Sequence, residues 1–242
     1  NGVWVAGGTP GTTNENTLVY STDGKEWTAV NEDPLGTIAN RICFTVQYLN
    51  DLWFAGGYGG TAGGSVVKLW NSANGIDWTP TSGAPFGTDV GARPGKMAYG
   101  NNVYIAVGTP SSTNGGLWYS SNGTNWSEAS TNPYTDNTKV FDVKFYNGLF
   151  VSVGLFGSGG TIVAWSTGRL NAVIPPNNKD DKWIVGGGAG STGISYYSTD
   201  GKTWYSIDEI ILAGGSIQSL TAGWAGRIGS STRRTVAVGS AT

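Results

Sequence analysis

The chain of 242 residues contains no histidine, one cysteine and one methionine, and charged residues are scarce, with 14 Lys and Arg against 16 Asp and Glu. Histidine is the side chain that most often serves as a general base or a zinc ligand near neutral pH, so its absence argues against both roles. A nucleic-acid-binding protein needs clustered cations to neutralise phosphates, and the nearest approach is the Arg233-Arg234 pair. We therefore expect no metal, no other cofactor and no nucleic-acid partner.

The single thiol and the short apolar runs argue against two further features, a disulfide and a membrane span. Cys43 lies within an apolar run and has no second cysteine in the chain to pair with, so we expect a buried structural thiol. No apolar stretch approaches the ~18 residues that a bilayer-spanning helix needs, so we expect no membrane insertion. The chain begins with Asn1-Gly2 rather than Met, and we expect it to be part of a longer protein.

Glycine and aromatic residues are abundant instead, with 40 Gly, 11 Trp, 11 Tyr and 7 Phe. The glycines recur at fixed places, because an apolar strand that ends in glycine returns six times, in residues 4–8, 53–57, 104–108, 150–154, 183–187 and 235–239. Self-similarity at a fixed period indicates a repeat architecture. Most of the aromatic residues are then expected to belong to the scaffold.

Each repeat is predicted to consist of four antiparallel strands. Before the glycine-ending strand lies another short apolar run, joined to it by a two-residue turn such as Asn50-Asp51, Asn101-Asn102 or Asn147-Gly148, which is typical of a hairpin. After it come a loop rich in Gly, Ser and Thr, a third strand, and a turn of the form Ser-x-Asp/Asn-Gly-x-x-Trp that leads into a fourth strand. The four copies of this turn contain Ser21, Asp23, Gly24 and Trp27; Ser72, Asn74, Gly75 and Trp78; Ser120, Asn122, Gly123 and Trp126; and Ser198, Asp200, Gly201 and Trp204.

The repeat predicts an all-β fold, a β-propeller of four-stranded antiparallel blades, because its spacing of about 46 to 52 residues suits one blade. Six blades are favoured over five, within a single domain that covers residues 1–242. The tryptophans of the four turns are expected to pack between blades. The blades are placed at approximately 1–30, 41–82, 95–130, 140–174, 182–208 and 216–242.

The fourth interval is short and departs from the pattern. Residues 166–168 (Ser-Thr-Gly) are interpreted as a degenerate turn. Residues 175–178 (Pro-Pro-Asn-Asn) are interpreted as a linker in the place where the first strand of the fifth blade should be.

The Ser-x-Asp/Asn-Gly-x-x-Trp turns resemble the Asp-box, or BNR repeat, of sialidase-like β-propellers and their non-enzymatic relatives. Glycine follows Asp or Asn directly in every copy, whereas the usual box has one residue between them, so the resemblance is to a divergent branch. It implies that the boxes are structural turns on the side away from an active site. A sialidase would also have an arginine triad and a Phe/Tyr-Arg-Ile/Leu-Pro motif, but Arg41 lies between Asn40 and Ile42. We therefore expect no catalytic residues and a chain that is not an enzyme.

Loop residues remain as candidates for a binding site. Tyr58, Phe86, Tyr134 and Phe156 stand in loops predicted to open on one face of a propeller, beside Asn, Ser and Thr, which suits sugar or protein surfaces. The alternative is that each ring folds back onto its own blade. The adjacent Glu32 and Asp33 are expected to be solvated loop charges, since neighbouring residues in an extended chain point to opposite sides.

The leading functional hypothesis is a non-catalytic interaction module in a virion, tail-fibre or cell-surface assembly. The weakly charged, Gly/Asn/Ser/Thr-rich composition resembles that of propellers in such proteins. Its partners would be other proteins of the assembly, with glycans as further ligands, and its location would be extracellular or on a virion surface. The alternatives are a carbohydrate-binding, lectin-like propeller and a sialidase-like glycoside hydrolase, because a fold does not dictate a function.

Overall fold

The computed structural model describes residues 2–11, 15–36, 41–58, 69–87, 92–110, 115–130, 134, 139–146 and 149–155, and beyond these the strands at 169–174, 183–189, 192–198, 205–206, 215–224 and 233–241. Every regular element within these ranges is a β-strand, so the predicted all-β class is confirmed. In the same ranges, no helix is present that is long and apolar enough to cross a membrane.

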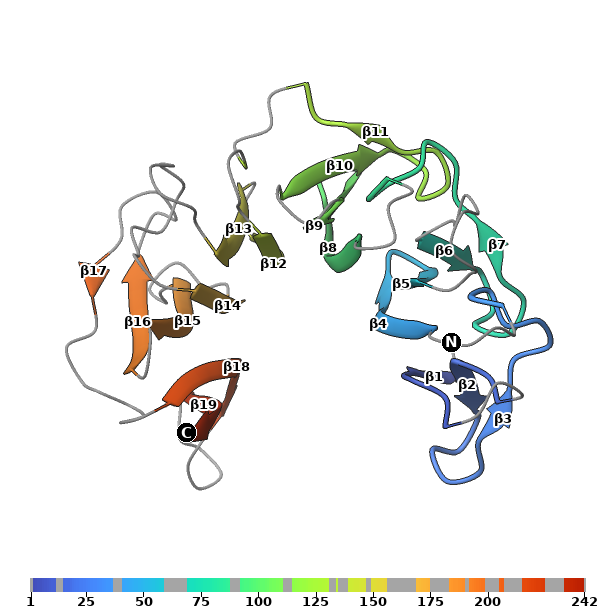
Figure 1. The fold of residues 1–242 in the computed structure, drawn as a ribbon, viewed down its shortest axis with the longest axis horizontal. Coiled ribbons are helices and arrows are strands. Elements are labelled where there is room, and N and C mark those ends of the chain that lie inside the picture. Colours follow the sequence, from blue (N-terminus) through green and yellow to red (C-terminus); the bar gives the residue numbers. More distant parts are fainter. Residues whose placement is uncertain are drawn as a thin grey trace. The chain divides into compact units, whose positions relative to one another are not determined.

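The strands form six antiparallel sheets, which we number in chain order (Figure 1). The first sheet contains β1 (Trp4–Gly7), β2 (Leu18–Ser21) and β3 (Thr28–Ala29). The second contains β4 (Ile42–Leu49), β5 (Leu52–Tyr58), β6 (Leu69–Ser72) and β7 (Thr79–Pro80), and the third contains β8 (Arg93–Gly100), β9 (Val103–Thr109), β10 (Gly116–Ser120) and β11 (Ser127–Glu128). The fourth is the hairpin of β12 (Lys139–Tyr146) and β13 (Leu149–Leu155). The fifth contains β14 (Arg169–Ile174), β15 (Trp183–Ala189), β16 (Thr192–Ser198) and β17 (Tyr205–Ser206), and the sixth is the hairpin of β18 (Gly215–Trp224) and β19 (Arg233–Ala241).

The predicted four-stranded antiparallel sheet is confirmed in the second, third and fifth sheets, while the described residues give three strands in the first and two in the fourth and sixth. The six sheets fall into two compact units. Unit 1, Asn1–Asn132, holds the first three sheets, and unit 2, Pro133–Thr242, holds the others. Within unit 1, β1 contacts β4, and β8 contacts both β4 and β5. Within unit 2, β14 contacts β12 and β13, and β18 contacts β14, β15 and β16. The number of blades, the closure of a ring and the single domain stay predictions.

The boundary between the fourth and fifth repeats differs from the one predicted. Strand β14 pairs with β15, so Arg169–Ile174 form the first strand of the fifth sheet and not the end of the fourth repeat. The Pro-Pro-Asn-Asn stretch follows that strand rather than replacing it. The apolar alternation that would have revealed β14 is broken at its start, where the pairing shifts register between Leu170 and Ala172.

The same irregularity recurs in the first strand of every sheet from the second to the sixth. A β-bulge leaves one or more residues without a ladder partner and re-aims their side chains. In the third sheet the bulge leaves Gly95 and Lys96 without ladder partners. Met97, the next residue, pairs with Ala106, and the side-chain amide of Gln47 in the second sheet accepts from the Met97 N–H at 2.7 Å and donates to its carbonyl at 2.9 Å. The shifts lie between Cys43 and Thr45, Pro94 and Met97, Val140 and Asp142, Leu170 and Ala172, and Ile217 and Ser219.

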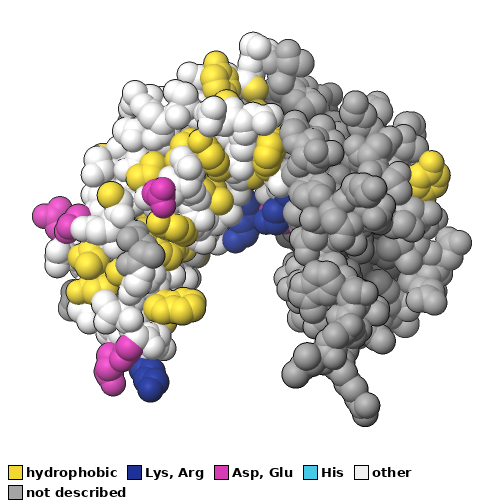
Figure 2. Space-filling view, turned by 180° about the vertical axis from the view of Figure 1, so that it is seen from behind, with side chains coloured by type: hydrophobic (Ala, Val, Ile, Leu, Met, Phe, Trp, Pro, Cys, Tyr) yellow, Lys and Arg dark blue, Asp and Glu magenta, His cyan; other side chains and the backbone are white. Residues whose placement is uncertain are grey.

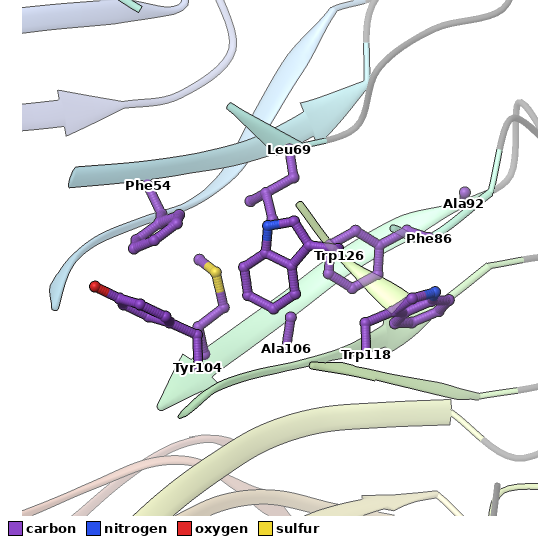
Figure 3. Close-up of a cluster of buried hydrophobic side chains, with 9 residues drawn as sticks. Phe54, Leu69, Phe86, Ala92, Tyr104, Ala106, Trp118 and Trp126 are labelled. Carbon is purple, nitrogen blue, oxygen red and sulfur yellow. The ribbon is translucent and has the colours of Figure 1, made fainter. Parts of the chain in front are cut away.

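Large aromatic residues fill the space between the second and third sheets. Trp126, from the turn before β11, lies in the middle of the buried cluster drawn in Figure 3 and is 4% exposed. Its ring centroid lies 6.2 Å from Phe54 on β5 and 6.5 Å from Tyr104 on β9, while Phe54 and Tyr104 are 5.4 Å apart. Two residues of the third sheet therefore cover one residue of the second sheet, at the spacing that edge-to-face aromatic pairs favour.

The tryptophans predicted to pack between blades do so unequally. Trp126 is buried as predicted, and Trp78 is half-buried against a smaller cluster of Leu18, Val30, Leu35, Cys43 and Ala55. Trp27 is 44% exposed, and Trp4, which occupies in the first sheet the place of Tyr104 in the third, is 62% exposed. Trp204 lies outside the described residues.

Replacing Trp126 by Ala should destabilise the protein by about 3–5 kcal/mol, because the change opens a cavity between two sheets. The same substitution at Trp27 should cost much less, because nearly half of that side chain is already in water. Urea unfolding of the full chain, followed by fluorescence and circular dichroism, compares the two variants. Equal losses of stability would contradict the placement of Trp126 between the sheets.

Candidate functional site

The Ser-x-Asp/Asn-Gly-x-x-Trp turns share one hydrogen-bond pattern in the three copies that the structure describes. The serine Oγ accepts from the backbone N–H of the glycine at 2.8–2.9 Å, in Ser21, Ser72 and Ser120 alike. The Asp or Asn Oδ1 accepts from the backbone N–H groups two and three residues further along, also at 2.8–2.9 Å. In the fourth copy, Ser198 is described only as the end of β16, and Asp200, Gly201 and Trp204 lie outside the described residues.

These hydrogen bonds show that the serine and the Asp or Asn stabilise the conformation of the turn. The backbone N–H groups of Lys25 and Glu26, joined by the Ser21 hydroxyl, lower the pKa of the Asp23 carboxyl. The neutral amides of Asn74 and Asn122 accept the same bonds, so the turn requires an acceptor oxygen and not a charge. The Asn74 amide also donates to the carboxylate of Asp77 at 2.8 Å and, together with Asn31, lowers the pKa of that carboxyl.

The glycines of the second and third turns, Gly75 and Gly123, meet the sheet before them. Gly75 has φ +80°, and a Cβ there would lie 2.9 Å from Val5 of the first sheet. Gly123 has φ +75°, and a Cβ there would lie 2.9 Å from both Leu52 and Phe54 of the second sheet. Gly24 has nearly the same φ, +74°, but its closest neighbour is the Trp4 indole nitrogen at 3.9 Å. The turns are therefore points where consecutive sheets approach closely.

A buried ion pair was missed by the sequence analysis. The Asp33 side chain is 2% exposed and that of Arg41 is 1% exposed, and Arg41 Nε lies 3.5 Å from Asp33 Oδ2. Asp33 also accepts from the N–H and hydroxyl of Thr17 and from the N–H of Leu35, and Arg41 donates to the carbonyl of Glu15. The prediction of a solvated charge is thus wrong for Asp33, because its carboxylate joins two loops to the start of β4. Removing one member of such a pair would leave the other buried without a partner of opposite charge.

Two of the four loop aromatics prove to be core residues. Phe86 and Tyr134 are each 1% exposed, so the alternative, that the ring folds back onto the sheet, is correct for both. The turn from Ala84 to Gly87 directs Phe86 onto Trp118, with ring centroids 4.8 Å apart. Tyr134 is hydrogen-bonded to Ser152, and burial raises its pKa to about 12. Phe156 lies outside the described residues.

Cys43 is confirmed as a buried free thiol, and burial raises its pKa to about 11. A thiol with so high a pKa carries little thiolate near neutral pH, and it packs in the cluster between the first and second sheets. Within the described residues, no three His, Cys, Asp or Glu side chains gather in a way that could hold a metal ion.

Tyr58, the remaining loop aromatic, belongs to a partly exposed group of side chains. We call this group the Phe44 cluster, and it consists of Phe44, Thr45, Tyr58, Arg93 and Lys96. Phe44 is the residue that the bulge in β4 leaves without a ladder partner. Its ring centroid lies 5.5 Å from that of Tyr58, at the end of β5, and both rings are half-buried. Because a bulge re-aims a side chain, this pair departs from the alternation of the rest of the strand.

Two cations from the third sheet complete the Phe44 cluster. The Arg93 guanidinium carbon lies 5.8 Å from the centre of the Phe44 ring, within the range of a cation–π contact. Lys96, at the bulge in β8, lies with its Nζ 3.4 Å from the Thr45 hydroxyl. Few of the described side chains on the face drawn in Figure 2 are charged, in keeping with a chain that has 14 Lys and Arg among its 242 residues.

No protein-family model matches the chain, and neither does any curated protein. Among solved structures it is similar to an N-acetylgalactosamine deacetylase from F. plautii in complex with blood group B trisaccharide, with a TM-score of 0.42 and 15% identity over 97% of this chain and 78% of that one. It is also similar to fructan 1-exohydrolase IIa from Cichorium intybus, with a TM-score of 0.37 and 15% identity over 81% of this chain and 39% of that one. A third is Trypanosoma rangeli sialidase in complex with sialic acid, with a TM-score of 0.35 and 17% identity over 84% of this chain and 35% of that one.

The prediction that the chain is not an enzyme is corrected by this comparison, because the similar structures named here are all enzymes. With TM-scores of 0.35–0.42 and 15–17% identity, these similarities transfer no catalytic residue and no substrate to this chain. The turn residues keep the structural role that their hydrogen bonds show, and the Phe44 cluster is the candidate site.

The turn glycines provide a matched pair of substitutions. Gly24→Ala should cost roughly 1–2 kcal/mol from the left-handed backbone alone. Gly123→Ala should cost clearly more, because its methyl group also meets Leu52 and Phe54 of the preceding sheet. Denaturant unfolding of both variants measures the difference, and equal losses would show that the turn does not act as a close contact between sheets.

Proposed function

We propose that the chain is a β-propeller module that recognises carbohydrate through the Phe44 cluster. The observation that carries this proposal is a half-buried pair of aromatic rings, Phe44 and Tyr58, with the Arg93 guanidinium 5.8 Å from the centre of the Phe44 ring and Lys96 at hydrogen-bond distance from the adjacent Thr45 hydroxyl. A sugar ring presents C–H groups to the negative face of an aromatic ring and hydroxyl groups at its rim. Binding sites in general combine apolar and aromatic walls with a few placed polar groups.

The supporting scaffold is suited to hold such a site. Phe44 stands on β4, Tyr58 ends β5 and Arg93 begins β8, so the cluster is shared by the second and third sheets of unit 1. These sheets are tied together beside it by the two hydrogen bonds between Gln47 and Met97. A site on rigid strands loses little conformational entropy when a ligand binds.

We also propose that the module works within a larger assembly at a virion or cell surface. The weakly charged, polar composition supports this location. The exposed rings of Trp4 and Trp27 support a protein neighbour, because the equivalent Tyr104 and Trp126 are covered by another sheet. The test is whether the protein fractionates with particles from its native source; recovery only as a free monomer would contradict it.

Phe44→Ala should abolish or weaken glycan binding by about tenfold or more, since it removes one of the two rings that form the contact. A glycan array with the full chain identifies a ligand, and calorimetry on that glycan compares Phe44→Ala with Tyr119→Ala. Tyr119 is an exposed ring on β10, outside the cluster, and serves as the control. An array without hits, or equal affinity of wild type and Phe44→Ala, would refute the proposal. Product analysis of the bound glycan in the same samples reports whether the protein also cleaves it.

A further inference from the structure

Among the described residues, the two cations of the Phe44 cluster, exposed Arg93 and half-buried Lys96, have no acidic partner. The ion pairs found among the described side chains are those of Arg41 with Asp33 and of Lys144 with Asp142, so neither Arg93 nor Lys96 has a carboxylate of that part of the chain within ion-pairing distance. Lys96 is half-buried, and its one partner among the described residues is the neutral Thr45 hydroxyl. The chain as a whole carries a net charge of −2, so this local excess of positive charge does not follow from its composition.

The position of Arg93 leaves its donors available. A guanidinium placed over an aromatic face keeps its five N–H groups in its own plane, directed outward, where they match a carboxylate or sulfate in a two-pronged geometry. The side chain is exposed, and its guanidinium makes no hydrogen bond to another side chain or carbonyl among the described residues. Contact with Phe44 restricts the arginine without consuming its hydrogen-bonding capacity, which lowers the entropy lost when an anion binds.

We infer that the saccharide recognised by the Phe44 cluster carries an anionic group, either the carboxylate of a hexuronic acid or a sulfate ester, which Arg93 and Lys96 bind while the sugar ring lies against Tyr58 and Phe44. This inference rests on the proposed function and specifies its ligand. The aromatic ring and the ammonium group both come from β-bulges. Phe44 is left without a ladder partner by the bulge in β4, and Lys96 by the bulge in β8. An aromatic surface beside two cations fits a ring that is apolar on its face and charged at its edge.

The experiment measures calorimetric affinities of the full chain for inorganic sulfate and for three oligosaccharides of similar length. A hyaluronan hexasaccharide carries carboxylates as its only charged groups, and a carrageenan hexasaccharide carries sulfate esters as its only charged groups. N-acetylchitohexaose carries no charge. Wild type is compared with Arg93→Gln, Arg93→Lys and Lys96→Gln, and with Lys25→Gln, which removes an exposed lysine from the first turn as a control for overall charge.

We expect at least one anionic oligosaccharide to bind about tenfold or more tightly than the neutral one, and Arg93→Gln to remove most of that preference. Arg93→Lys should restore only part of it, because an ammonium lacks the two-pronged geometry. Binding should also weaken as salt rises, since the contact is partly exposed. Which anionic sugar binds identifies carboxylate or sulfate as the group recognised.

Other outcomes separate the two proposals. Equal binding of the neutral sugar, unaffected by Arg93→Gln but lost in Phe44→Ala, would overturn the anionic ligand and keep carbohydrate recognition. Equal affinity for inorganic sulfate and for the sulfated sugar would overturn the saccharide as ligand of the cations. Failure of wild type to bind either anionic sugar would overturn the anionic ligand, whereas carbohydrate recognition itself is overturned by a glycan array without hits. Thermal unfolding of each variant is measured beside wild type, so that a lost affinity is not a loss of folding.

Discussion

Close contact between consecutive sheets at the turn glycines is the constraint on which the rest of unit 1 depends. A four-stranded sheet cannot bury both of its faces alone, so each sheet must receive side chains of its neighbour. Val5 reaches Gly75, and Leu52 and Phe54 reach Gly123, at distances that leave no room for a methyl group. The serine and Asp or Asn bonds of each turn fix the loop so that the glycine is presented at this point.

The candidate site lies at the β-bulge in the first strand of the sheets, where the backbone of the repeats is similar but the side chains differ. The bulge recurs in five sheets, but the residue that it sets free is Phe44 in the second sheet, while the bulge of the third carries Lys96. The turns, in contrast, keep the same residue types because their hydrogen bonds demand them. Variation at a position that packing does not determine allows one pair of sheets to acquire a surface that the others lack.

Much of the fold was predictable from the sequence, because hairpin turns and the box turns follow from local chemistry. Asn50 and Asp51 adopt the positive φ expected of a two-residue hairpin, and the periodic glycines predicted the four-stranded sheets. The site was less predictable. Nothing local distinguishes Phe86, which is buried, from Tyr58, which is half-exposed, and the Asp33–Arg41 pair joins residues whose proximity depends on how two sheets pack. The bulge that frees Phe44 leaves no mark in hydrophobic alternation.

The Ser-x-Asp/Asn-Gly-x-x-Trp turn accepts either Asp or Asn at its third position, and this has a consequence for spontaneous deamidation of the protein. Asparagine followed by glycine is the dipeptide most prone to spontaneous deamidation, and Asn74 and Asn122 both precede glycine. At Asn122, conversion to aspartate would reproduce the acceptor that Asp23 already supplies in the first turn. At Asn74 it would set a new carboxylate against Asp77, whose oxygen now receives the amide proton. The aspartate product would therefore be tolerated at Asn122 and repelled at Asn74, whereas the isoaspartate that the same reaction forms would lengthen the backbone and disturb either turn.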